Sequence, residues 1–123
     1  MTTIDSALKD AMSIEGAIGA AIVDYTSGMT LGVAGGSAEL DLSVAAAGNT
    51  DVVRAKIRAL EMLRMSDGIE DILITLDTQY HLIRPLSARS GSGLFLYLAL
   101  HRTRANLGLA RHLLRQIEAS IEV

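Results

Sequence analysis

The sequence predicts an α+β fold in which helices cover the apolar faces of an antiparallel sheet. Apolar runs of strand length and segments of helical period follow one another in the order α-β-β-α-β-β-β-α. Every link between consecutive strands is short enough for a hairpin, and hairpins give antiparallel pairs. Two runs, residues 18–23 and 94–100, contain almost no polar residue, so we expect strands buried on both faces. Such faces need helices over them, which predicts an α+β sandwich.

The first predicted elements are a helix and a hairpin. Thr2-Thr3 can cap a helix whose apolar residues fall on one face, and Gly16 is expected to end this helix at the C′ position. Strands near 17–24 and 29–35 follow. The residues from Asp24 to Gly28 supply the turn chemistry between them.

A long helix is predicted from about Asp41 to Met65, because its composition favours helix. Gly48-Asn49-Thr50 is the weak point, where a separate helix could begin. At 100° per residue the apolar side chains cover about 220°, whereas a helix on one sheet needs about 100°. The excess predicts burial on two sides. If the helix is continuous, it carries a ridge of small residues that lets another backbone approach closely: Gly48, Val52, Ala55 and Ala59.

Three further strands and a helix complete the prediction. A strand is expected over Ile69–Leu76, with Ile72, Ile74 and Leu76 on one face. Strands at 80–86, ending near Pro85, and at 94–100 follow, joined by a loop over 87–93. Asn106 caps the last helix. Its apolar face is Leu107, Leu109, Ala110, Leu113, Leu114, Ile117 and Ile121, and Arg111, His112, Arg115 and Glu118 are expected on the opposite face.

Composition bounds the class of protein. The chain has 123 residues, so we expect one domain over 1–123, and its net charge of −3 does not indicate a nucleic-acid partner. The longest apolar run, 94–100, is far too short for membrane insertion, so we expect a cytoplasmic protein. The hydrophobic share of 50% is high for a small soluble domain, which favours a surface hidden against a partner.

Motifs for catalysis, metals or cofactors are not found in the sequence. His81, His101 and His112 have no ligand spacing, and there is no cysteine. The glycine-rich stretches 32–36 and 90–93 lack the Lys-Ser/Thr of a phosphate-binding loop. No GxSxG motif occurs, and the carboxylates of Glu70 and Asp71 are expected to face water at a strand start. We therefore predict no catalytic residue, no metal and no cofactor.

Four arginines follow the last predicted strand: Arg102, Arg104, Arg111 and Arg115. Solvation and pairing with the acidic N-terminal half of the chain is the favoured interpretation, because surface charges usually do no more. An arginine finger acting on a GTPase is the alternative. Nucleic-acid binding would need aromatic platforms as well, and Phe95 and Tyr97 lie in a strand expected to be buried.

The order and spacing of three stretches resemble the roadblock/dynein light-chain domain family over nearly the whole chain. The first is the strand Ala20–Asp24 with the turn residue Gly28, and the second is the long helix after Gly35-Gly36. The third, residues 106–111, resembles the start of the last helix in bacterial members. The resemblance implies a profilin-like/roadblock fold: a five-stranded antiparallel sheet with one long helix on one face and two helices on the other.

The resemblance also implies partners. Members dimerise by pairing the central helix and the strand after it, here Asp41–Met65 and Ile69–Leu76, and they regulate or scaffold small Ras-like GTPases. We therefore expect a non-enzymatic homodimeric interaction module that binds such a GTPase. Its expected interface is Gly48, Val52, Ala55, Ala59, Met62, Ile72 and Ile74. The alternative is a small-molecule-sensing α+β domain, which would need a pocket with converging polar groups.

Overall fold

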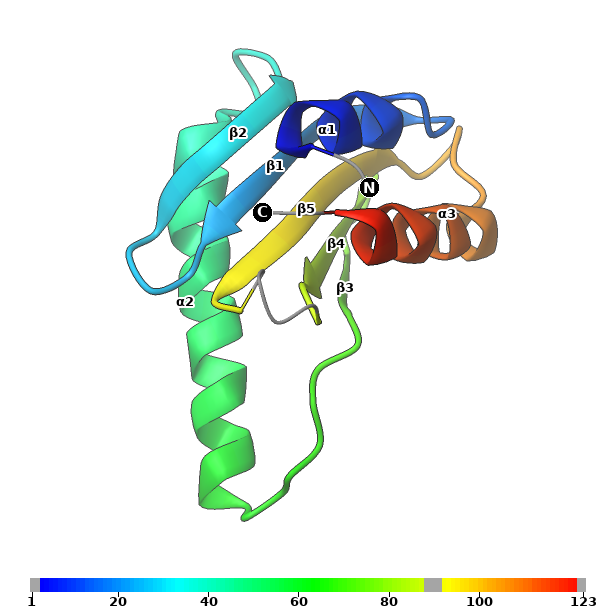
Figure 1. Ribbon diagram of the computed structural model, residues 1–123. Helices are drawn as coiled ribbons and strands as arrows, with labels where there is room; N and C mark the ends of the chain where they lie inside the picture. The colour runs from blue at the N-terminus through cyan, green and yellow to red at the C-terminus, as the bar shows by residue number, and fades with distance from the viewer. Residues whose placement is uncertain (1–2, 88–91, 122–123) are drawn as a thin grey trace.

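The computed structural model, which describes residues 3–87 and 92–121, contains the predicted elements in the predicted order (Figure 1). The helices and strands are α1 (Ile4–Met12), β1 (Ala17–Asp24), β2 (Met29–Gly35), α2 (Leu42–Met62), β3 (Ile72–Thr75), β4 (Gln79–Pro85), β5 (Leu94–His101) and α3 (Leu107–Ser120). The predicted bounds of the first hairpin, 17–24 and 29–35, are confirmed.

The five strands form one antiparallel sheet in the order β2-β1-β5-β4-β3. The two most apolar strands, β1 and β5, lie side by side near its middle, with Ala20 opposite Leu98 and Ile22 opposite Leu96. This confirms the prediction that the first strand lies beside residues 94–100. A strand with neighbours on both sides and helices on both faces needs no polar residue, which explains why both runs are apolar.

Each face of the sheet has its own core. Successive residues of a strand point to opposite faces, so Ile22 and Leu98 belong to one core and Ala21 and Tyr97 to the other. Helices α1 and α3 cover the first face, and α2 covers the second (Figure 1). This confirms the implied arrangement of one long helix against two shorter ones.

The first helix begins as predicted but ends earlier. Thr3 Oγ1 accepts a hydrogen bond from Ser6 N at 3.2 Å and caps α1, whereas Thr2 lies outside the described residues. The helix ends at Met12, so Gly16 is not its C′ residue. Gly16 instead takes φ +90° in the turn before β1, where an added Cβ would lie 3.2 Å from Ala105. The glycine marks this close approach of two connections rather than a helix end.

The turn of the first hairpin is held by Asp24. Its Oδ1 accepts from Thr26 N at 2.8 Å and from Thr26 Oγ1 at 2.6 Å. These bonds stabilise the carboxylate and lower the pKa of Asp24. Gly28 completes the turn at φ +82°, a conformation that suits glycine.

Three expectations about the later elements are wrong. Strand β3 covers only Ile72–Thr75 rather than Ile69–Leu76, and Leu76 is exposed beyond its end. In α3, Leu109 is exposed although it was placed on the apolar face, and Glu118 is 4% exposed although it was placed on the polar face. The predicted cap is confirmed, since Asn106 Oδ1 accepts from Leu109 N at 3.0 Å. Of the predicted loop 87–93, residues 88–91 lie outside the described residues.

Candidate interaction surface

Helix α2 is continuous through the predicted weak point. Asp41 caps it by accepting from Ser43 N at 2.9 Å and Val44 N at 3.3 Å. Thr50 does not start a new helix, because its Oγ1 donates to the carbonyl of Ala46 at 2.7 Å inside the same helix. A Cβ added at Gly48 would meet no described atom within 4 Å. The small-residue ridge therefore lies along one unbroken helix.

One side of α2 packs on the sheet, and none of the described helices or strands covers the other. The buried residues are Leu42, Ala46, Thr50 and Val53. Within the rest of the predicted apolar arc, Ile57, Ala59 and Leu60 are partly buried, whereas Val52, Ala55, Leu63 and, at 74%, Met62 are exposed. Figure 1 shows the C-terminal half of α2 running beyond the sheet. Residues 3–87 and 92–121 therefore do not cover the second side of α2 that the sequence predicts to be buried.

The predicted interface residues lie on one side of the molecule. Gly48, Val52, Ala55 and Ala59 recur at intervals of three and four residues, which places them along one helical face. Ile72 and Ile74 of β3 are partly buried and pack against the same core cluster as α2. Strand β3 ends the sheet, so one of its edges has no neighbour among the described strands. We call this region the α2–β3 surface: Gly48, Val52, Ala55, Ala59, Met62, Ile72 and Ile74.

A cavity of about 350 Å³ lies between the C-terminal half of α2 and the chain that returns to the sheet. Its apolar wall is Ile57, Leu60, Met65, Ile69, Pro85 and Leu86, and Tyr25, Glu61, Asp67 and Ser87 also line it. Ile57 and Leu60 follow the buried Val53 at intervals of four and three residues, so the cavity lies on the sheet-facing side of α2, away from the ridge.

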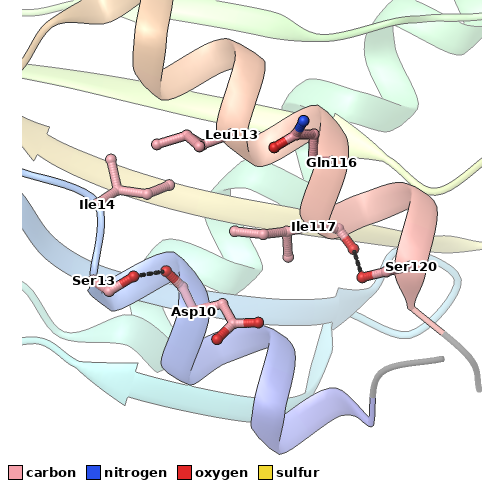
Figure 2. A pocket seen from close by; sticks show the side chains of 7 residues that line it. All are labelled: Asp10, Ser13, Ile14, Leu113, Gln116, Ile117 and Ser120. Carbon is pink, nitrogen blue, oxygen red and sulfur yellow. Dashed lines mark hydrogen bonds between the residues drawn. The ribbon is translucent and has the colours of Figure 1, made fainter.

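A second cavity of about 310 Å³ lies between α1 and α3 on the opposite face of the sheet (Figure 2). Ile14, Leu113 and Ile117 line it together with polar side chains at its rim. The Ser13 hydroxyl donates to the backbone carbonyl of Asp10 at 2.6 Å, and the Ser120 hydroxyl donates to that of Ile117 at 2.8 Å. These hydroxyls already have partners, and the site does not favour the small-molecule alternative.

Buried charges join α3 to the sheet. Arg84 of β4 is buried, and its Nε donates to Glu118 Oε1 of α3 at 3.1 Å. Arg84 Nη1 lies 3.9 Å from Asp71 Oδ2, and Ser87 Oγ donates to Glu118 Oε2 at 3.0 Å. Sequence reasoning missed this cluster. A signal was present, because Arg84 alternates with Leu82 and Leu86, which both belong to the core under α1 and α3.

Comparisons with known proteins give a match at the level of structure. A comparison with protein-family models finds no match, and neither does one with curated proteins. The crystal structure of a Roadblock/LC7 domain from Streptomyces avermitilis matches with a TM-score of 0.79 at 13% identity, over 97% of this chain and 94% of that one. The chain has the Roadblock/LC7 fold.

Other solved structures share this fold. MglB from Myxococcus xanthus matches with a TM-score of 0.73 at 17% identity, over 92% of this chain and 77% of that chain. The gliding protein MglB from Thermus thermophilus matches with a TM-score of 0.68 at 17% identity, over 94% and 88%. The resemblance recognised in the sequence is therefore confirmed as a shared fold.

The arginines of this Roadblock/LC7 fold have partners other than those predicted. Arg111 donates to both oxygens of Asp71, at 2.9 and 2.8 Å, and Arg115 pairs with Glu70. Both acids belong to the C-terminal part of the chain, so the predicted pairing with the acidic N-terminal half is wrong. Asp71 does not face water as predicted, since its side chain is 10% exposed, whereas Glu70 does. The bond to Asp71 raises the pKa of Arg111.

Arg102 is engaged at the end of β5. Its Nη1 donates to the carbonyl of Leu76 at 2.9 Å, and its guanidinium lies 5.2 Å from the centre of the Tyr80 ring. These contacts hold the β3–β4 turn against the sheet. They also give Arg102 a structural role within the chain.

A row of hydrogen-bonded polar side chains lies beneath α2 in this fold. Tyr97 Oη lies 3.2 Å from His81 Nδ1, and His81 Nε2 lies 2.7 Å from Gln79 Oε1. Burial raises the pKa of Tyr97 to about 12, and a hydrogen bond with Asn49 offsets part of the rise. Burial lowers the pKa of His81, because the cation would lose its hydration.

We expect stability to fall as the pH drops below 6.5, the ordinary pKa of histidine. The folded protein binds this proton at a lower pH than the unfolded chain does. The stability from neutral His81 is therefore complete above 6.5 and is lost as the pH falls through the folded pKa. Urea unfolding at about pH 7.5 and about pH 5.5 measures the change. His81→Gln should flatten this dependence, and the matched control His112→Gln, at an exposed position of α3, should leave it unchanged.

The described residues were searched for metal-binding clusters and for membrane-spanning helices. Within residues 3–87 and 92–121, no three His, Cys, Asp or Glu residues come together in a way that could hold a metal ion. In the same residues, no helix has the length and apolar character needed to cross a membrane. The glycine-rich stretch 90–93 falls partly outside the part of the chain that the structure describes.

Proposed function

We propose that the protein is a non-enzymatic, homodimeric interaction module that binds and regulates, or scaffolds, a small Ras-like GTPase. The observation that carries the proposal is the α2–β3 surface. It combines an unbroken helix, exposed apolar side chains and an edge strand that has no neighbour on one side among the described strands. A second copy offers the same combination. Around a two-fold axis, the two copies of α2 can pack against each other while the two β3 edges pair.

The dimer is supported by two physical arguments. Small residues at Gly48, Ala55 and Ala59 allow two copies of α2 to approach closely. The exposed side chains of Val52 and Met62 beside them would then be removed from water, which is favourable. An unpaired strand edge presents N–H and C=O groups that a second β3 can pair with. Together they would extend the sheet across the dimer and cover the ridge.

The GTPase partner is supported by likeness rather than by a contact. The resemblance implies association with small Ras-like GTPases, and the fold is shared with the gliding protein MglB and with MglC. The match to MglC from Myxococcus xanthus has a TM-score of 0.54 at 24% identity, over 94% of this chain and 90% of that one.

Light scattering on the purified protein tests the dimer. We expect twice the mass of one chain at concentrations of about 1–10 μM, because permanent apolar interfaces bind in this range or more tightly. A clean monomer under these conditions would remove the dimeric half of the proposal.

A pull-down tests the GTPase. The immobilised protein is incubated with a small GTPase from the same genome, loaded with GTP or with GDP, and retention is compared between the two states. Nucleotide-dependent retention supports regulation, and equal retention supports a scaffold. If the Ras-like GTPases of that genome are retained in neither state, the GTPase half is wrong while the dimer can still stand.

A further inference from the structure

Strand β3 is held in the sheet by few backbone hydrogen bonds. It is four residues long and pairs only with β4 among the described strands. The chain before it, residues 66–71, forms neither helix nor strand. Across residues 3–87 and 92–121, none of the backbone hydrogen bonds of turns and loops involves residues 66–71. So short an edge strand specifies its register weakly by itself.

Asp71 supplies the missing attachment. It directly precedes Ile72, whose partner in β4 is Ile83, so Asp71 lies beside Arg84. Its carboxylate accepts a two-pronged bond from Arg111 of α3, at 2.8 and 2.9 Å, and lies 3.9 Å from Arg84. Two-pronged arginine–carboxylate bonds fix orientation as well as distance. The residue before the strand is therefore tied to two elements at once.

The tie continues into the core beneath α3. Arg84 is held at 3.1 Å by Glu118, which also accepts from Ser87 at 3.0 Å. Negative and positive side chains alternate in the order Asp71, Arg84, Glu118. Arg111 pairs with Asp71 at the more exposed end of this series. Asp71, Arg84 and Glu118 have side chains at most 10% exposed. Charges this buried keep their partners, because leaving one unpaired is costly.

We infer that Asp71 is the positioning residue of β3, and that through Arg111 and Arg84 the helix α3 sets the partner-binding edge from the opposite face of the sheet. A slip of one residue would turn Ile72 and Ile74 away from the α2 side. The role of the edge in dimerisation rests on the proposed function, whereas the attachment of β3 rests on the contacts above. Asp71 touches no partner itself; it acts through the strand that follows it.

Native-state hydrogen exchange tests the inference on Asp71→Asn and Arg111→Gln. We expect the amides of β3 to exchange at least about tenfold faster in both variants, while β1 and β5 keep their protection within about twofold. The matched control is Glu70→Gln, which removes the neighbouring acid and its exposed pair with Arg115. This control should leave β3 unchanged. Arg111→Lys, which keeps the charge but loses the two-pronged bond, should restore part of the protection.

Two results would overturn the inference. One is wild-type protection of β3 in both variants. The other is an equal loss of protection in β1, β5 and β3, which would mean that Asp71 serves only overall stability. The exchange is repeated in an Ala55→Asp background, so that a dimer does not mask β3. If the wild-type protein is a monomer, the proposed function fails, and the exchange data still decide the role of Asp71.

Discussion

Replacing Arg84 by methionine is expected to lower the free energy of unfolding by about 3–5 kcal/mol. The side chain of Arg84 is buried between two carboxylates, at 3.1 Å from Glu118 and 3.9 Å from Asp71. Methionine fills a similar volume but leaves Glu118 without its cation in a site where water cannot replace it. Most of the loss therefore comes from the stranded carboxylate rather than from the missing attraction.

Urea unfolding monitored by circular dichroism measures this change. The double variant with Arg84→Met and Glu118→Leu should recover most of the loss, because an apolar pair leaves no buried charge. Arg115→Gln is the matched control, since Arg115 pairs with Glu70 at an exposed position and should cost at most about 1 kcal/mol. A loss below about 1 kcal/mol for Arg84→Met would show that water reaches Glu118.

Ala55→Asp is expected to convert the proposed dimer into a folded monomer. Ala55 is exposed within the α2–β3 surface, so the carboxylate is hydrated in one chain and costs little there. In the dimer, two such carboxylates would meet in a dry helix contact. We expect the dissociation constant to rise at least about 100-fold, because unpaired charges at buried contacts are strongly disfavoured.

Sedimentation or light scattering over a concentration series measures the dissociation constant, and circular dichroism verifies the fold. Ala47→Asp is the matched control, because it makes the same change at an exposed position of α2 outside the ridge. It should leave the dimer intact. A variant Ala55→Asp that stays dimeric and folded would show that the interface lies elsewhere, and Ala59→Asp would then give the same result.

The sequence predicts this fold well where burial is uniform. The runs 18–23 and 94–100 lie in the central strands, and the caps at Thr3 and Asn106 act through short-range hydrogen bonds that a local pattern can reveal. Helix α2 is predicted through Gly48 because the residues around it favour helix more than one glycine disfavours it. Its free apolar side was likewise visible in the width of the apolar arc.

The errors lie where distant residues decide the outcome. The helical pattern places Glu118 on the polar face of α3, and its burial depends on hydrogen bonds from Arg84 and Ser87, 34 and 31 positions earlier. Ile69 to Asp71 continue the pattern of a strand, yet Asp71 turns to Arg111 of α3, so the ladder begins at Ile72. Local periodicity carries no information about such partners. For the same reason, local periodicity does not identify the partner that we propose for the α2–β3 surface.

The place of β5 in the sheet has a consequence for synthesis. The first hairpin, β1–β2, and the second, β3–β4, never touch through their strands; both are joined only by β5, the last strand to leave the ribosome. Until residues 94–101 are made, the inner edges of β1 and β4 have no neighbour, and the two halves of the sheet cannot assemble. Pairing of β1 with β5 closes a long loop, which slows folding. In the nascent chain, the edge of the apolar strand β1 that pairs with β5 therefore stays exposed until β5 is made.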